Sequence, residues 1–527
     1  MHVDMHSDLK MADEHTEQVA TQPAFKDWFN LRLAYNLATI AMAMVLFGYD
    51  NAVTSPLVSL PLFVLKYGDA KSVGSFAFTA NDLDLLVCVP LVGAVLGAFI
   101  GVPLQRWLGR KNTMLIAYAL TSVPGSFLQL FAPNMAAMIV GRLWNNIGIS
   151  ILTSVVPLFM AELVPAHVRG RVTGMAAAGS GASSVIATVV VWGTAKLIDD
   201  RQYKIPLAVQ AALAGLLFIM SLFLTESPAW LVSKGRIEDA RTQLLKLRRQ
   251  NEAIVDHEIN SIAAVLAAAS EAKSSVRFKE ILARKNWART FMASSYLPAG
   301  QVGGQSLAIT YSTVLFVQAG VSNAFLMTIL VFLLQFLGNM VGPFLSDRLG
   351  RRTIALGGIS TLVVLDFTAG GLACGGLKTN PQILGLAALS CIFAFVNAAS
   401  FQSLAYIFPT EIPDAKLREP TMTWSLFWSY ATAIITTFAT PQIINPDAGN
   451  LGAKAYLIFG GCALIVVIYS YFLLPETARR TLDEIDDLYR QGVPPRKWGR
   501  KKNVDTVTEV ELQAKDAAIT AVAKHVE

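Results

Sequence analysis

The stretch Asp347-Arg348-Leu349-Gly350-Arg351-Arg352 repeats, with small changes, the earlier stretch Gln105-Arg106-Trp107-Leu108-Gly109-Arg110-Lys111. Each copy follows a long apolar run and directly precedes another. A soluble protein has no use for one basic turn repeated between apolar runs, whereas a membrane protein with two homologous halves needs the turn in each half. The repeat therefore predicts a membrane protein built from two related halves.

The composition agrees with this interpretation. The chain has 527 residues, of which 54% are apolar and 15% are charged, whereas soluble proteins are nearer a quarter charged. The net charge of +6 lies between the apolar blocks, so it indicates membrane topology and argues against a nucleic-acid surface. The four cysteines lie far apart within apolar runs. We expect no metal site, no cofactor and no phosphate-binding loop for ATP.

Hydropathy predicts an all-α membrane protein, because the apolar blocks are long enough to cross about 30 Å of hydrocarbon as helices. The twelve predicted spans are approximately 34–60, 83–104, 113–132, 135–160, 172–196, 205–224, 292–316, 322–345, 354–375, 384–409, 421–443 and 454–474. They define an N-terminal tail (1–32), a first six-helix half (33–225), a helical insert (226–290), a second six-helix half (291–475) and a C-terminal tail (476–527).

Lysine and arginine gather in alternate connections and in the insert. By the positive-inside rule, both tails and the insert are expected in the cytoplasm, and the plasma membrane is the expected location. Within the insert, 237–249 and 254–269 have apolar residues at three- and four-residue spacing, which predicts amphipathic helices. The chain is expected to act as a monomer in the lipid bilayer.

Several motifs in order resemble the sugar porter family of the major facilitator superfamily, over roughly 30–490. The family pattern at the end of the fourth span is matched, with Phe in place of Tyr, by Pro157, Phe159, Glu162, Pro165, Arg169 and Gly170. Further matches are Glu411 with Arg418, Glu226-Ser227-Pro228 after span six, and Pro475-Glu476-Thr477 after span twelve. The resemblance implies the major facilitator fold, with two six-helix halves around a central cavity and additional intracellular helices.

The charged motifs imply a cytoplasmic gate. The expected gating residues are Glu162, Arg169, Asp347, Arg348, Arg351, Arg352, Glu411 and Arg418. Ion pairs between the halves would form when the cytoplasmic side closes and break when it opens. The positive-inside rule alone would explain the arginines but not the two glutamates at matching sites. In the first turn Gln105 stands where the resemblance expects Asp, which predicts a weaker latch in that half.

Asp50 lies inside the first span, after the apolar stretch from Ile40 to Leu46. A carboxylate in hydrocarbon is costly and marks a proton or ion path. Arg142, at the start of the fourth span, is expected to reach it, and movement of Arg142 would then switch the protonation of Asp50. Proton-coupled members of the family have an Asp at this position. A fixed structural Asp–Arg pair is the alternative.

The resemblance places substrate contacts in the second half. The residues concerned are Gln301, Gln305, Gln335, Gln402 and Tyr406. Amide groups both donate and accept hydrogen bonds, as sugar hydroxyls require, and an aromatic ring covers the apolar face of a pyranose. Family amides are lost at three positions, which predicts a roomier pocket for a disaccharide, a glycoside or another polyol-like metabolite: Ala177, Gly300 and Ser306. The alternative role for the retained amides is hydrogen bonding between helices.

These features predict a protein that is not an enzyme but a secondary active transporter. The expected function is proton symport of a sugar or sugar-like molecule by alternating access, with that solute and protons as its partners. A facilitative carrier or an exporter of another small metabolite is the alternative. A transporter-like nutrient sensor is a further one, although such sensors usually have a much longer cytoplasmic tail.

Overall fold

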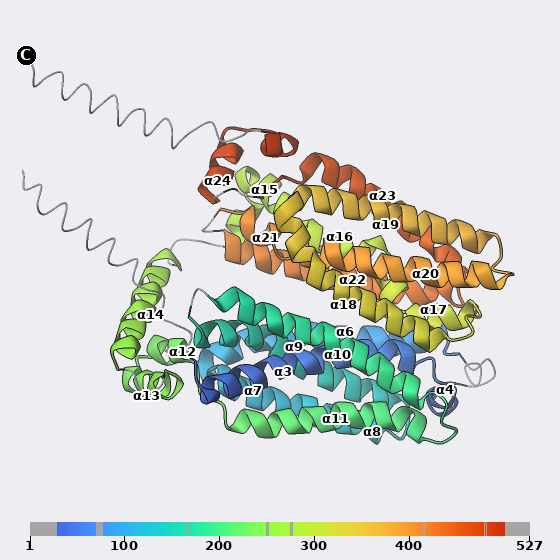
Figure 1. Cartoon of the computed structure of the whole chain (residues 1–527), viewed down its shortest axis with the longest axis horizontal. Coiled ribbons are helices and arrows are strands. Elements are labelled where there is room, and N and C mark those ends of the chain that lie inside the picture. Colours follow the sequence, from blue (N-terminus) through green and yellow to red (C-terminus); the bar gives the residue numbers. More distant parts are fainter. Residues whose placement is uncertain are drawn as a thin grey trace, which may run out of the picture. The chain divides into compact units, whose positions relative to one another are not determined.

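The computed structural model describes residues 29–69, 77–165, 168–248, 252–273, 278–414, 417–478, 480 and 482–500. The predicted N-terminal tail up to residue 28 and the basic residues beyond Arg500 lie outside this range. The described residues form helices and connections without a β-strand, as the sequence predicted (Figure 1). The chain divides into two compact units, one of Met1–Phe78 with Leu85–Ser275 and one of Thr79–Asp84 with Val276–Glu527.

The first unit is a helical bundle followed by the first part of the insert. Its transmembrane helices are α3 (Leu31–Leu57), α6 (Ala80–Leu108, in this unit from Leu85 on), α7–η1–α8 (Arg110–Ile116, Ala117–Ser122, Val123–Leu130), α9 (Met135–Leu163), α10 (Arg169–Thr194) and α11 (Arg201–Leu222). The short α4 (Pro61–Tyr67) follows α3. The helices pack through fully buried apolar side chains such as Leu46, Val155 and Leu217, and the van der Waals contacts between them stabilise the bundle.

The second unit contains the other half of the transmembrane helices. They are α16–η4–α17 (Tyr296–Gly300, Gln301–Thr310, Ser312–Gln318), α18 (Ala324–Leu349), α19 (Arg351–Cys374), α20–η5 (Asn380–Asn397, Ala398–Gln402), α22 (Arg418–Ile444) and α23 (Tyr456–Leu473). Shorter helices precede, connect and follow them: η3 (Phe278–Leu282), α15 (Arg284–Ser294), α21 (Phe408–Glu411), η6 (Gly452–Ala455), α24 (Leu482–Arg490) and η7 (Pro495–Arg500).

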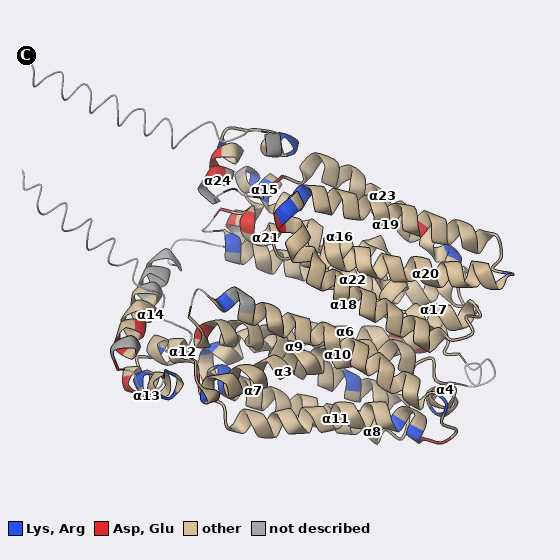
Figure 2. Ribbon diagram, viewed as in Figure 1, with Lys and Arg blue, Asp and Glu red and all other residues tan. Residues whose placement is uncertain are grey.

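Within the described residues, ten helical stretches are long and apolar enough to cross a membrane. The two predicted spans outside this set, 292–316 and 421–443, are also helical. The first of them is broken at η4, a π-helix in which Gly303 and Gly304 leave the helical conformation; the second is α22. Charged side chains lie mainly at helix ends and in the insert, so the spans of each unit are nearly free of them (Figure 2).

The insert is helical at both predicted stretches, in α13 (Ile237–Leu247) and α14 (Glu252–Lys273). The short α12 (Pro228–Ser233), which was not predicted, precedes them. Arg248, at the end of α13, is completely buried. It donates to the carbonyl of Leu163 at 2.9 Å and pairs with Glu258 of α14 at 2.9 Å. One arginine therefore fastens both insert helices to the end of α9.

Replacing Arg248 by alanine should release α13 and α14 from α9, because the carbonyl of Leu163 and the carboxylate of Glu258 both lose their donor. Hydrogen–deuterium exchange of the two helices should become faster. The matched control is Arg241→Ala, because Arg241 joins the same two helices through a more exposed pair with Asp256, and such pairs contribute at most about 1 kcal/mol. Equal exchange in the two variants would contradict this role.

Candidate functional site

Asp50 is held by three amide side chains. It lies on α3 and is only 4% exposed. Its Oδ1 accepts hydrogen bonds from Asn145 at 2.8 Å and from Gln210 at 2.6 Å. Its Oδ2 accepts one from Asn146 at 3.1 Å. Neutral groups from α9 and α11 therefore surround this carboxylate, and these three residues were missed by the sequence analysis, although amides inside apolar spans are themselves a signal of a buried polar site.

Arg142 is buried near Asp50 but makes other bonds. Its Nε donates to the carbonyl of Leu86 at 2.9 Å, and a terminal nitrogen donates to Oγ1 of Thr54 at 2.6 Å. Thr54 in turn donates to the backbone carbonyl of Asp50 at 3.3 Å. Among the described residues no ion pair joins Arg142 to Asp50, so the alternative of a fixed Asp–Arg pair does not match this geometry. The coupling role of both residues stays a prediction.

The two basic turns have the same backbone geometry. Gly109 has a φ of 91° and Gly350 a φ of 95°, a region that favours glycine. A Cβ on Gly109 would lie 2.4 Å from Oε2 of Glu226, and one on Gly350 would lie 2.5 Å from Oε2 of Glu476. Two features therefore favour glycine at both positions: the positive φ and the close approach of a carboxylate.

Each of these carboxylates caps the helix that follows the turn. Glu226 accepts hydrogen bonds from the backbone N–H groups of Arg110 at 2.9 Å and Lys111 at 3.1 Å. An anion is stabilised at a helix N-terminus, where backbone N–H groups have no partner within the helix. Burial raises the pKa of Glu226, while the hydrogen bonds from Ser227, Lys111 and Arg110 act in the opposite direction.

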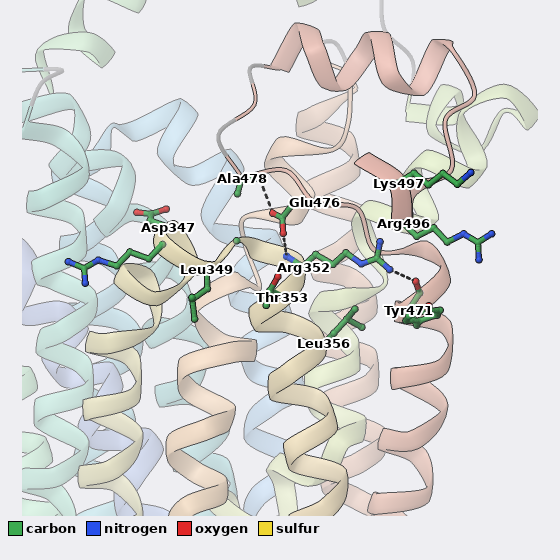
Figure 3. Close-up of a pocket in the computed structure, with 12 residues that line it drawn as sticks. Asp347, Leu349, Arg352, Thr353, Leu356, Tyr471, Glu476, Ala478, Arg496 and Lys497 are labelled. Carbon is green, nitrogen blue, oxygen red and sulfur yellow. Dashed lines mark hydrogen bonds between the residues drawn. The ribbon is translucent and has the colours of Figure 1, made fainter. Parts of the chain in front are cut away.

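Glu476 repeats this arrangement in the second unit. It accepts from the backbone N–H groups of Arg351 at 2.9 Å and Arg352 at 3.2 Å, and Figure 3 shows its carboxylate between Arg352 and Ala478. A cavity of about 800 Å³ adjoins the turn. In it the side chain of Arg352 points toward Tyr471 and donates to its carbonyl at 2.6 Å, whereas Asp347 lies on the other side of the turn (Figure 3).

The expected gating acids also occupy matching environments. Glu162 pairs with Arg110 at 2.7 Å and accepts a hydrogen bond from Ser227 at 2.5 Å. In the second unit Glu411 pairs with Arg351 at 3.6 Å and accepts one from Thr477 at 2.5 Å. Each acid is thus paired within its own unit. Ion pairs between the units stay a prediction, and Arg110 is a partner that the sequence analysis did not select for the gate.

The remaining gating candidates differ from one another. Asp347 pairs with Arg351 at 3.3 Å, one turn along the chain. No ion pair within the described residues involves Arg169, Arg348 or Arg418, and two guanidinium nitrogens of Arg418 are buried without a partner. Counting from the glycines, the residue of the first turn that corresponds to Asp347 is Arg106. The sequence-based assignment of Gln105 to the position that corresponds to Asp347 was therefore wrong by one residue.

The predicted substrate residues all belong to the second unit. Gln301 and Gln305 lie on η4, Gln335 on α18 and Gln402 on η5, and Tyr406, which follows η5, is 56% exposed. The four glutamines are partly exposed. Their amides have no hydrogen-bond partner among the described residues. The alternative role, hydrogen bonding between helices, is therefore not seen for these four side chains.

Two of the three lost amides do not enlarge a pocket. A Cβ on Gly300 would lie 3.2 Å from the ring of Phe401, so that position is filled by packing. Ser306 is 2% exposed, and its hydroxyl accepts a hydrogen bond from Thr440 at 3.1 Å. The interpretation of these two residues as extra space was wrong because it ignored their neighbours. Ala177 on α10 is exposed and remains an open position.

Replacing Glu226 or Glu476 by glutamine should lower the melting temperature of the purified chain. Hydrogen bonds to a charged group contribute about 1.5–3 kcal/mol, and a neutral amide replaces the carboxylate that each turn binds. The two losses should be similar, because the two turns match. Glu238→Gln, at an exposed position of α13, is the control and should have no effect. Melting temperatures equal to that of the control would show that the caps carry no stability.

Comparison with known proteins agrees with this geometry. The family model described as "Sugar (and other) transporter" matches residues 37–489. The general alpha-glucoside permease of Saccharomyces cerevisiae is 28% identical over 469 residues, which cover 87% of this chain and 75% of the permease. The major facilitator-type transporter ecdD of Aspergillus rugulosus is 27% identical over 475 residues, 86% of each chain.

Among solved structures, the inward-open xylose transporter XylE of E. coli superposes with a TM-score of 0.71 at 18% identity, covering 86% of this chain and 99% of that one. This similarity shows the major facilitator fold, as the sequence predicted. The family match extends from the first transmembrane helix to α24 and includes both basic turns with their capping glutamates. The chain therefore belongs to the sugar transporter family and is a multi-pass membrane transporter.

Proposed function

We propose that this protein is a proton symporter for a sugar or sugar-like solute and that it works by alternating access. The observation that carries the proton-coupling part is the environment of Asp50. Burial disfavours its charge, whereas the amides of Asn145, Asn146 and Gln210 stabilise it. Because Asp50 has no ion pair among the described residues, a small displacement of α9 or α11 is enough to change whether it binds a proton.

Four glutamine amides support a sugar as the solute. Gln301, Gln305, Gln335 and Gln402 offer donors and acceptors that no other described residue uses, as a polyhydroxylated ligand requires. Other glutamines of the spans bond within the protein; Gln129, for example, donates to the carbonyl of Gly125 at 3.3 Å. The likeness to an alpha-glucoside permease and the open position at Ala177 favour a disaccharide or glycoside.

The charged residues at the helix ends support the gating part. Glu162 with Arg110 and Glu411 with Arg351 form matching pairs in the two units. We propose that these pairs exchange partners during alternating access, and that the partly unbonded guanidinium of Arg418 is one of the alternative partners. The distribution of lysine and arginine supports cytoplasmic termini and a cytoplasmic insert. A monomer in the plasma membrane completes the proposal.

A facilitative carrier is the alternative, and uptake separates the two. The purified chain in proteoliposomes should be screened with labelled hexoses, pentoses, disaccharides and polyols, with and without an inward proton gradient. Symport predicts accumulation above the external concentration only with the gradient. Equal solute concentrations inside and outside the vesicles, with or without the proton gradient, would establish a facilitative carrier.

Asp50→Asn should abolish this uphill accumulation while leaving exchange of internal for external solute. Asparagine retains the shape of the acid but can neither release nor bind the proton. The measurement is accumulation and exchange of the solute selected by the screen, with Asp239→Asn on the exposed face of α13 as control. Undiminished uphill uptake by Asp50→Asn would remove this residue from the coupling mechanism.

Gln301→Ala and Gln335→Ala should each weaken solute binding by about ten- to a hundredfold, since a lost partner for a buried hydroxyl costs about 1–3 kcal/mol. The measurement is the concentration of half-maximal exchange. Gln129→Ala is the matched control: it removes a glutamine that bonds within the protein, so it should lower thermal stability but not affinity. Unchanged affinity in the first two variants would place the solute elsewhere.

A further inference from the structure

A second buried acid lies in the second unit. Asp366 is on α19, within the apolar run Val363-Val364-Leu365-Asp366-Phe367, and is 0% exposed. Neither of its carboxyl oxygens has a hydrogen-bond partner among the described residues. Asp50, in contrast, has three donors. Asp366 is not among the functional residues predicted from the sequence, and neither the gate nor the predicted sugar contacts use it.

The carboxyl of Asp366 lies against η4 and α23. A Cβ on Gly304 would lie 3.5 Å from both carboxyl oxygens of Asp366, and a Cβ on Gly460 would lie 3.0 Å from the Cβ of Asp366. On α23, the phenol of Tyr456 lies within electrostatic reach of Asp366, and its hydroxyl is hydrogen-bonded to Ser390 of α20 at 2.9 Å.

The other elements packed against α19 bring no charge to this place. Sequence shows that η4 and η5 contain no ionisable residue and that α20 contributes Cys391, which is uncharged at neutral pH. The charged residues of α18, Asp347 and Arg348, are at its end beside the basic turn, and Lys454 of η6 is exposed. An ionised Asp366 would therefore be an isolated charge in apolar surroundings, which is strongly disfavoured.

The helix that faces this acid is broken at the point of contact. Gly303 has φ −76° and ψ 20°, and Gly304 has φ 93° and ψ 4°. These conformations interrupt the regular backbone hydrogen bonding of a helix, and π-helical segments of this kind are frequent at functional sites. Backbone N–H groups at such a break can turn toward a neighbouring anion. The same segment carries Gln301 and Gln305.

We propose that Asp366 is a second proton-binding group of this carrier and that loss of its proton reshapes η4. With the proton on a carboxyl oxygen, the neutral acid packs against Gly304 as observed. When the O–H bond breaks and the proton passes to water, the carboxylate requires donors, and the break at Gly303–Gly304 supplies them by moving. The proposal rests on the proposed function, since it makes the shape of the predicted sugar-binding segment depend on protonation.

Two measurements on the full chain in lipid nanodiscs test this without any substrate. Infrared spectroscopy follows the carbonyl stretch of a protonated carboxylic acid as pH rises. Hydrogen–deuterium exchange of residues 301–310, corrected for the intrinsic effect of pH, follows the shape of η4. In the unmodified chain, a protonated-acid band should disappear and the exchange of η4 should change over the same pH interval.

Asp366→Asn and Asp366→Leu should lose that band, and η4 should keep the exchange of the low-pH form at every pH. Asp50→Asn, which removes the buried acid of the first unit, should keep both responses. The proposal is overturned if the Asp366-dependent band persists over the whole pH range in which the protein stays folded. It is equally overturned if η4 still responds to pH in both Asp366 variants.

Neither readout involves transport, so the two proposals can fail separately. If Asp50→Asn loses uphill uptake but Asp366 shows no pH-dependent band, symport stands and the second proton site is removed. A titrating Asp366 together with unaffected uptake in Asp50→Asn would remove the proposed coupling at Asp50 and retain this site.

Discussion

The cost of placing a charge in hydrocarbon is the constraint on which the rest of this structure depends. The spans of both units are nearly free of charged side chains, and the charges gather at the helix ends (Figure 2). Where a charge does enter a span, the protein must compensate it or keep it neutral. The carboxylate of Asp50 has three amide donors, whereas the carboxyl of Asp366 has none among the described residues, and this difference is the basis for proposing that Asp366 binds a proton.

The same constraint explains the repeated basic turns. A helix that starts at the membrane surface exposes N–H groups without partners, and a carboxylate that follows the last transmembrane helix of the same unit satisfies them. Glu226 does this in the first unit and Glu476 in the second. A second acid in each unit, Glu162 or Glu411, then binds the arginine that directly follows the glycine of the turn. In each unit these two acids are therefore paired within that unit, and exchange of their partners is the basis of the proposed gate.

Much of this architecture could be predicted from the sequence, because hydropathy, helical periodicity and the repeated turn are local signals. They gave the all-α class, the positions of the spans and the amphipathic helices of the insert. The family motifs pointed to Glu162 and Glu411 before any geometry was available.

These local signals could not show which side chains meet in the folded chain. The amides around Asp50 come from two other helices, and only their packing brings Asn145 and Gln210 to one oxygen. Gly300 and Ser306 were misread for the same reason, since Phe401 and Thr440 fill the space beside them. Asp366 was a detectable exception, because a single acid inside an apolar span is itself a signal.

In the proposed mechanism, movement of a sugar is coupled to movement of a proton. The most direct measurement places the purified chain in proteoliposomes loaded with a pH-sensitive dye, without a membrane potential or an imposed pH gradient, and adds an inward gradient of the transported sugar. The account predicts that sugar entry acidifies the interior of vesicles containing the unmodified chain, and that Asp50→Asn vesicles show no acidification. Sugar entry without acidification by the unmodified chain would contradict the account.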